Sequence, residues 1–180
     1  MAHITIVPPD DATGELAVLY ARIAAARGGI ANMHQVQSHN PKAMAAHLEL
    51  YKAILFQPSS ISRAWREAIG VAVSRANQCA YCVAHHEAAL AALPPIEIPA
   101  ALLDWAVRLT REPHAASADD VAALRAVGLD DRGILDAILT VGYFNFVNRL
   151  VLATGLALEA GYADTCSPHM MKSVDGRASE

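Results

Sequence analysis

No segment of the chain alternates apolar and polar residues over several positions, which is the pattern expected of a half-buried strand. Apolar, alanine-rich stretches are instead separated by capping and breaking residues, and this arrangement is typical of helices. The predicted helices cover about residues 13–27, 41–56, 60–76, 79–93, 100–111, 117–126 and 132–160. We therefore predict an all-α fold.

Short polar motifs set the expected helix ends. Asn40 followed by Pro41 predicts an N-cap and a first helical residue, and Gly28 predicts the end of the first helix. Asn77 is the candidate left-handed residue that ends the helix before the cysteines. Ser117 begins a pattern similar to a capping box. These signals make each helix boundary a local prediction.

The last predicted helix, 132–160, is apolar around nearly its whole circumference. A helix without a wet face must be buried on most sides, and in a chain of 180 residues this favours an interface between subunits. The alternative is a central core helix in a monomer. Five polar or charged residues interrupt the stretch, so we expect no membrane-spanning segment.

Composition narrows the class of protein. The net charge is −4 and Lys and Arg are scattered, so the chain lacks the basic footprint of a nucleic-acid or membrane-surface protein. The first residues lack the features of a secretory signal, which makes the cytoplasm the expected location. Three cysteines are too few for a disulfide scaffold, so a Cys-x-x-Cys pair points to redox chemistry or metal binding.

That pair is Cys79 and Cys82, followed by His86. On a helix, Cys82 and His86 lie one turn apart on the same face, and Cys79 precedes them on that face. If the helix begins at Cys79, its dipole and free N–H groups lower the pKa of a thiol in the first turn. His86 can then accept or relay a proton near neutral pH.

Glu67 lies twelve residues before Cys79. On one continuous helix the two side chains would face apart by about 120°. If the chain turns back at 76–78, the two helices become antiparallel neighbours and Glu67 can approach the cysteines. Its mainly apolar sequence neighbours would raise the pKa of the carboxyl group, which suits a proton shuttle.

Other interpretations stay open. The pair and His86 could belong to a structural zinc site with Cys166, His85 or Glu67 as the fourth ligand, although the spacing is not that of a zinc finger. Glu67 could be an ordinary solvated helix residue. His85 faces about 100° away from His86, which fits a polar surface or interface residue. Tyr81 fits a packing role, and Cys166 has no evident role.

The four residues Glu67, Cys79, Cys82 and His86 form the pattern Glu, eleven residues, Cys-x-x-Cys, three residues, His. This pattern resembles the alkylhydroperoxidase D-like (AhpD-like) core of the carboxymuconolactone decarboxylase superfamily. The flanking segments HNPKAMAAHLELYKAIL and DDRGILDAILTVGYFNFVNRLV resemble the subgroup of peroxidase-related proteins. The resemblance covers most of the chain. It implies one AhpD-like domain over residues 1–180, with the motif core at about 58–110 and a polar tail from about 165.

The resemblance further implies a helical bundle of about six to eight helices and a homo-oligomer, either a trimer, a hexamer or a dimer. It implies a peroxidase that uses no metal or other cofactor, only a redox-active Cys79–Cys82 disulfide. Its partners would be a small hydroperoxide and a dithiol or protein reductant, with Glu67 and His86 as the proton relay. Because Cys82 lies one turn from His86, we predict Cys82 as the peroxidatic cysteine and Cys79 as the resolving one.

One position departs from the family pattern. The best-known members carry an additional histidine just before the second cysteine, and here that position is Tyr81. A tyrosine can donate a hydrogen bond but is a poor base at neutral pH. Tyr81 and His85 are therefore accessory candidates only. A disulfide oxidoreductase or a redox sensor on the same scaffold remains the alternative function.

Overall fold

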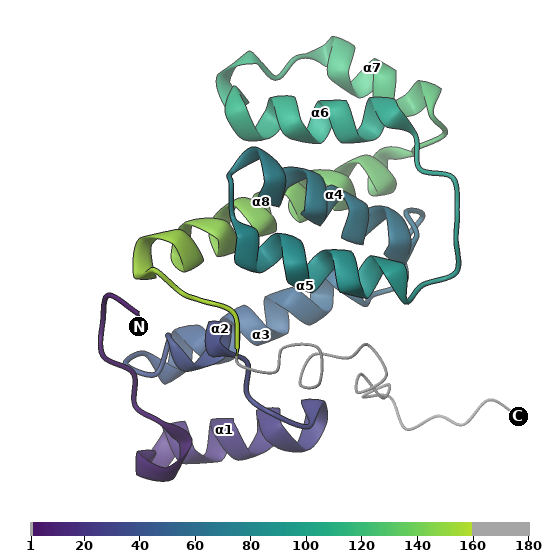
Figure 1. Cartoon of the computed structure of the whole chain (residues 1–180). Coiled ribbons are helices and arrows are strands. Elements are labelled where there is room, and N and C mark those ends of the chain that lie inside the picture. Colours follow the sequence, from purple (N-terminus) through teal and green to yellow (C-terminus); the bar gives the residue numbers. More distant parts are fainter. Residues whose placement is uncertain (1, 160–180) are drawn as a thin grey trace, which may run out of the picture. The chain divides into compact units, whose positions relative to one another are not determined.

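The structure is a computed structural model that describes residues 2–159 (Figure 1). This part of the chain is entirely helical, which confirms the predicted fold class. Its elements are η1 (Pro9–Asp11), α1 (Gly14–Arg27), α2 (Asn32–Gln35), α3 (Pro41–Leu55), α4 (Arg63–Ala76), α5 (Ala80–Ala91), α6 (Ala100–Arg111), η2 (Pro113–Ala115), α7 (Ala118–Ala126) and α8 (Asp131–Thr154). The predicted tail and Cys166 lie outside the described residues.

The described residues fall into two compact units, and the boundary lies within α3. The prediction of one domain over the whole chain is not tested by this division and stays a prediction. The first unit takes residues 2–47 and 154–159. In it, the Tyr20 hydroxyl donates a hydrogen bond to the Val7 carbonyl over 3.0 Å, and the Val7 N–H donates to Ser38 over 3.0 Å. These bonds hold the extended N-terminal segment against α1.

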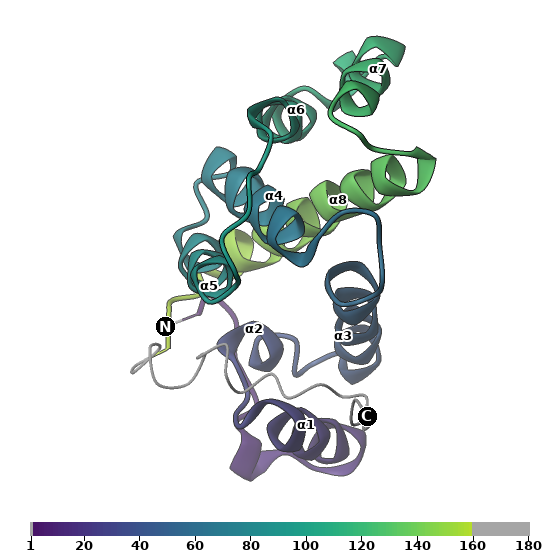
Figure 2. The ribbon, with the colours of Figure 1, turned by 90° about the vertical axis from the view of Figure 1, so that its right-hand side faces the viewer.

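The second unit, Leu48–Ala153, contains all four motif residues, and in it α4 lies between α5 and α6 (Figure 2). Its central element is α4, which packs against both α5 and α6. Nine of the fourteen residues of α4 are buried, so this helix, rather than α8, has almost no solvent-exposed side. Gly70 of α4 meets α8, because a Cβ at Gly70 would overlap the Phe144 ring. The motif therefore lies in the core of the second unit.

Most of the predicted helix ends are confirmed. The Asn40 side chain accepts a hydrogen bond from the Ala43 N–H, and Gly28 ends α1 in the left-handed conformation. Ser117 and Asp120 form a complete capping box. Between the helices predicted at 13–27 and 41–56, where no helix was predicted, the structure has the short helix α2. A single turn of helix is too short to produce a sequence period.

By length and composition alone, α8 could cross a membrane, contrary to the expectation from its interrupting polar residues. Half of the relevant stretch is buried inside the protein. Asp136, Thr140 and Asn148 are among its buried positions, and Thr140 donates a hydrogen bond to the Asp136 carbonyl. A helix that buries polar side chains against its own chain has the character of a core helix.

Candidate active site

A tight turn between α4 and α5 places the first cysteine. The N–H of Gln78 donates to the Arg75 carbonyl, and the N–H of Cys79 donates to the Ser74 carbonyl. These two bonds form a Schellman motif, in which the residue after the C-cap takes the left-handed conformation. That residue is Gln78, with φ of 59°, and not Asn77 as predicted, because Asn77 is itself the C-cap. The chain folds back here as expected, and Cys79 becomes the N-cap of α5.

Glu67 is fully buried, so the interpretation as a solvated residue is wrong. One carboxylate oxygen accepts a hydrogen bond from Arg63 Nε over 2.6 Å, and the other lies 2.6 Å from His86 Nδ1. Burial by itself raises the pKa of Glu67, but His86 and Arg63 outweigh it and lower the pKa. The predicted rise of this pKa is therefore wrong. The carboxylate is ionised and holds its two partners in place.

His86 is oriented from two sides. Because the ionised Glu67 accepts at Nδ1, that nitrogen carries a proton and Nε2 is left to act as the base. The imidazole and the Phe144 ring pack edge to face, with a centroid distance of 4.5 Å and an angle of 88° between their planes. Phe144 is itself buried above Gly70 of α4. The sequence analysis singled out neither Phe144 nor Arg63. Phe144 acts only through contacts between helices, whereas Arg63 lies four residues before Glu67 on α4, a spacing from which the pair could have been predicted.

Cys79 and Cys82 are free thiols with 0% and 2% exposure. Both sulfurs are therefore shielded from solvent. A hydrogen bond from the Cys82 side chain lowers the pKa of Cys79 to about 7, despite the opposing effect of burial. The same bond, together with burial and the charge on Cys79, raises the pKa of Cys82. The hydrogen bond between the two sulfurs therefore moves their pKa values in opposite directions, with Cys79 as the more acidic thiol.

A buried amide of α8, Asn148, reaches the second sulfur, that of Cys82. Asn148 is fully buried and donates to Ser74 Oγ over 3.1 Å, while its carbonyl oxygen accepts from Asn77 Nδ2 over 2.9 Å. Asn148 also hydrogen-bonds the Cys82 side chain, which opposes the rise of the Cys82 pKa. The network joins α8 to the turn that precedes Cys79. Asn148 lies about seventy residues from the motif, so sequence spacing could not have identified it.

The structure thus joins the four motif residues as two direct pairs, Glu67 with His86 and Cys79 with Cys82. Among the described residues, no hydrogen bond joins His86 to either sulfur, although His86 follows Cys82 by one turn of α5. The accessory candidates contact each other, because the rings of Tyr81 and His85 lie 4.3 Å apart. Residues 2–159 contain no group of three or more metal-binding side chains placed around one point.

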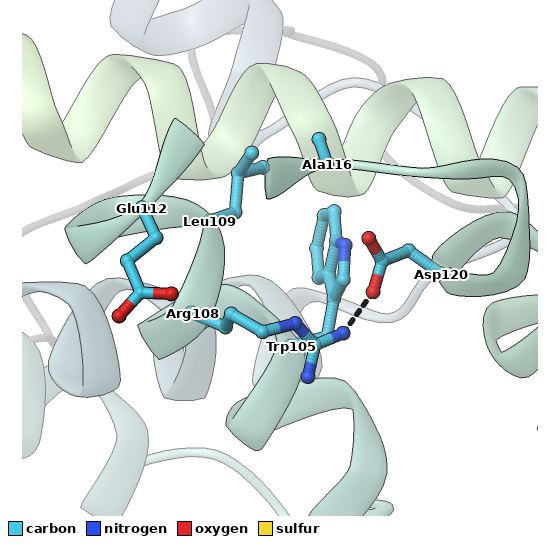
Figure 3. Close-up of a pocket in the computed structure, with 6 residues that line it drawn as sticks. All are labelled: Trp105, Arg108, Leu109, Glu112, Ala116 and Asp120. Carbon is cyan, nitrogen blue, oxygen red and sulfur yellow. Dashed lines mark hydrogen bonds and ion pairs between the residues drawn. The ribbon is translucent and has the colours of Figure 1, made fainter. Parts of the chain in front are cut away.

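A surface hollow lies elsewhere in the second unit, beside α6 and the segment that leads into α7 (Figure 3). Trp105, Arg108 and Asp120 are among the residues that line it, and Arg108 pairs with Asp120. No motif residue lines this hollow. Its ion pair joins α6 to the start of α7, which is a structural role.

Comparisons with known proteins agree with this architecture. The family model for the carboxymuconolactone decarboxylase family matches residues 41–124, a range that includes all four motif residues. No curated protein matches the chain. An uncharacterised peroxidase-related protein from Silicibacter sp. TM1040 is 26% identical, with a TM-score of 0.75 over 88% of this chain and 93% of that chain.

Two further solved structures share the fold. The AhpD core protein from Ralstonia eutropha JMP134, also described as peroxidase-related, is 22% identical, with a TM-score of 0.77 over 89% of this chain and 94% of that one. The debrominase Bmp8 is 17% identical, with a TM-score of 0.67 over 94% of this chain and 98% of its own. Residues 41–124, which hold the motif core, thus match the carboxymuconolactone decarboxylase family model, and the chain shares its fold with the AhpD core protein and the peroxidase-related protein.

Proposed function

We propose that the protein is a thiol-dependent peroxidase that reduces small hydroperoxides through the Cys79–Cys82 pair. One observation carries the proposal: a hydrogen-bonded thiol pair with a Cys79 pKa of about 7 lies on the same helix as a histidine held by a buried carboxylate. The superfamily and the peroxidase-related neighbours support a general antioxidant-like role. The pair itself is the redox group, so the reaction requires no further cofactor.

In the first step, the Cys79 thiolate attacks the terminal oxygen of the hydroperoxide. An S–O bond forms, the O–O bond breaks, and the alcohol leaves after taking up a proton, so that Cys79 becomes a sulfenic acid. We assign this attack to Cys79, and not to Cys82 as the spacing predicted, because the thiolate is the nucleophile and Cys79 has the lower pKa.

In the second step, Cys82 attacks the sulfenic sulfur of Cys79. The disulfide forms, the S–O bond breaks, and water leaves. The proton of the Cys82 thiol passes to Nε2 of His86, one turn later on α5, where the Glu67 carboxylate stabilises the charged ring. From Nε2 the proton goes on to the leaving hydroxide of the sulfenic acid, which departs as water, so that His86 ends the step neutral. A dithiol or protein reductant then restores the pair by thiol–disulfide exchange. A compartment that keeps thiols reduced, such as the cytoplasm, suits this cycle.

The test is turnover with hydrogen peroxide and a dithiol in Cys79→Ser, Cys82→Ser and Cys166→Ser, the last as a matched cysteine control. The first two variants should lose turnover, while the control should keep it. In Cys82→Ser, a single oxidant equivalent should leave a dimedone-reactive sulfenic acid on Cys79, detected by peptide mass spectrometry. If sulfenic acid forms faster on Cys82 in Cys79→Ser than on Cys79 in Cys82→Ser, Cys82 is the attacking cysteine, as its spacing from His86 predicts. Turnover in both single variants would refute the proposal.

The pKa of Cys79 and its dependence on Cys82 can be measured directly. Thiolate absorbance near 240 nm should rise with a midpoint near pH 7 in the wild-type protein. In Cys82→Ala the donor to Cys79 is lost, so the midpoint should move up toward the ordinary cysteine pKa of about 8.5. An unchanged midpoint in this variant would show that another group sets the pKa of Cys79.

A disulfide oxidoreductase or redox sensor would use the same pair. Either would form the disulfide with one equivalent of peroxide but would show no sustained consumption of peroxide with a dithiol present. Comparing the rate of disulfide formation with steady-state turnover therefore separates these functions from a peroxidase.

A further inference from the structure

Asn148 is a buried polar side chain to which the two chemical steps proposed above give no role. It lies on α8 with an exposed fraction of 0%, and Phe144 and Val151, one turn before it and one turn after it, are buried apolar residues. Burying an amide among such neighbours costs free energy unless its donors and its acceptor find partners. The partners of the amide therefore decide whether its role is structural or chemical.

The orientation of this amide follows, step by step, from a backbone carbonyl. Asn145 Nδ2 donates to the Val141 carbonyl over 3.0 Å, and a carbonyl only accepts, so this bond identifies the nitrogen of Asn145. The Oδ1 of Asn145 then accepts from Asn77 Nδ2 over 3.1 Å. The same Asn77 nitrogen donates to Asn148 Oδ1 over 2.9 Å. The Nδ2 of Asn148, with its two hydrogens, is therefore the atom that faces away from Asn77.

The two hydrogens of this nitrogen have different partners. Asn148 Nδ2 donates one of them to Ser74 Oγ over 3.1 Å. Asn148 also hydrogen-bonds the Cys82 side chain and thereby lowers the pKa of that thiol, which means that the sulfur accepts and the second N–H donates. Cys82 in turn donates its own hydrogen to Cys79. The bonds thus run in one direction, from the amide to Cys82 and from Cys82 to Cys79.

The bond from the amide matters most after peroxide has reacted. Before that step, the hydrogen bond to Cys79, burial and the charge on Cys79 raise the pKa of Cys82. Once Cys79 is a sulfenic acid, its sulfur carries no thiolate charge, while the Asn148 N–H still points at the sulfur that must now lose its proton. A donor bonds a charged sulfur more strongly than a neutral one, so it favours the thiolate, which is the nucleophilic form.

We propose that Asn148 is a catalytic residue of the resolving step, in which its N–H stabilises the Cys82 thiolate while this sulfur attacks the Cys79 sulfenic acid. The inference rests on the proposed function and adds to it a group that lies outside the Glu-Cys-Cys-His motif. The S–S bond forms and the S–O bond breaks. The proton of the Cys82 thiol leaves with the hydroxide as water, by way of His86.

Single-turnover kinetics separate this step from the attack on peroxide. Reduced protein is mixed with one equivalent of hydrogen peroxide and quenched with dimedone at intervals, and peptide mass spectrometry then measures sulfenic acid and disulfide. Asn148→Leu keeps the approximate shape of the side chain but has no N–H. Sulfenic acid on Cys79 should form at the wild-type rate, and the disulfide should form about tenfold more slowly, as expected from the loss of one hydrogen bond to a charged group.

The pH dependence distinguishes chemistry from structure. In Asn148→Leu, the pH at which disulfide formation reaches half of its maximal rate should move upward, because a thiolate without its donor has a higher pKa. Thr140→Val is the matched control, since Thr140 is another fully buried polar residue of α8 and donates to the Asp136 carbonyl. This control should lower stability without changing the rate or the pH dependence of either step.

A second variant approaches the amide from the other end of the network. Asn77 is half-buried, and Asn77→Ala removes the donor that fixes the orientation of the Asn148 amide. This variant should slow disulfide formation by a smaller factor, about threefold. It provides the test if Asn148→Leu does not fold, and a wild-type rate of disulfide formation in Asn77→Ala would then overturn the inference.

Two kinds of failure can be told apart. Normal sulfenic acid formation in a folded Asn148→Leu protein, with the wild-type rate and pH dependence of disulfide formation, would overturn the inference alone. Equal slowing in Thr140→Val would likewise overturn it, because the effect would then come from the packing of α8. A wild-type protein that forms no sulfenic acid on Cys79 would refute the proposed function itself, and the inference with it.

Discussion

Arg66 and Glu67 are neighbours on α4, and both are buried, but their partners differ in kind. Arg66 donates from Nη1 to the backbone carbonyls of Ile54 over 2.9 Å and of Gln57 over 3.0 Å. Glu67 accepts from the side chains of Arg63 and His86. The first charge holds the connection between α3 and α4. The second faces α5 and holds a group that can exchange a proton.

This difference separates a structural charge from a chemical one more clearly than burial does. A backbone carbonyl does not titrate, so the contacts of Arg66 are the same at every step of a reaction. The contacts of Glu67 change in strength whenever His86 gains or loses a proton. Three substitutions test whether Arg66 has a structural role and Glu67 a chemical one.

The largest expected effect is on stability, from Arg66→Met. The substitution keeps much of the side-chain volume but leaves two carbonyls without their donor, at a cost of about 1–3 kcal/mol each. We expect the free energy of unfolding, measured with urea, to fall by about 2–5 kcal/mol. The fraction that remains folded should keep its thiol reactivity. A large loss of thiol reactivity without a loss of stability would mean that Arg66 takes part in the reaction.

Unlike Arg66→Met, the Glu67→Gln substitution should lower activity more than stability. The amide keeps the shape but cannot stabilise a charged His86, so kcat/KM should fall by about 100-fold, within the usual range for general acid–base catalysis. Arg63→Gln is the control, because it removes the other partner of Glu67 and leaves the Glu67–His86 contact in place. It should affect turnover less. Equal turnover in wild-type and Glu67→Gln protein would contradict the role of the carboxylate.

The Glu67→Gln variant should also differ from the wild-type protein in how its stability depends on pH. The folded pKa of Glu67 is lowered, so this group contributes stability that is present above the unfolded value of about 4.3 and is lost as pH falls through the folded pKa. Wild-type protein should therefore lose stability below about pH 4 more steeply than Glu67→Gln does.

The smallest effect concerns the packing behind His86. Gly70→Ala would place a Cβ against the Phe144 ring, and overpacking of this kind costs about 1–3 kcal/mol. Gly142→Ala is the matched control, since its Cβ meets nothing within 4 Å and alanine favours a helix by up to about 1 kcal/mol. Thermal unfolding should show opposite signs for the two variants. If Gly70→Ala left the thermal unfolding temperature unchanged, the Phe144 ring would have to move aside without cost.

Much of the helical order could be predicted because its signals are local. Asn40 and Ser117 bind N–H groups within one turn of themselves, and Pro41 begins a helix because it has no N–H that needs a partner. These roles do not depend on the rest of the fold. The turn between α4 and α5 was also predicted, although the left-handed residue is Gln78 and not Asn77. The error of one residue arose because sequence identifies which residue tolerates the conformation, whereas the bonds to Arg75 and Ser74 select the position.

The sequence by itself determined the fold class and the spacing that allows Glu67, Cys79, Cys82 and His86 to meet, because both follow from helix geometry. The tertiary structure decided the charge state at that meeting point. Burial alone predicts a raised pKa for Glu67, and only the approach of His86 from α5, together with Arg63, reverses the sign. The contact between the two sulfurs likewise lowers the pKa of Cys79 and raises that of Cys82, because a hydrogen bond has a direction that sequence spacing does not contain.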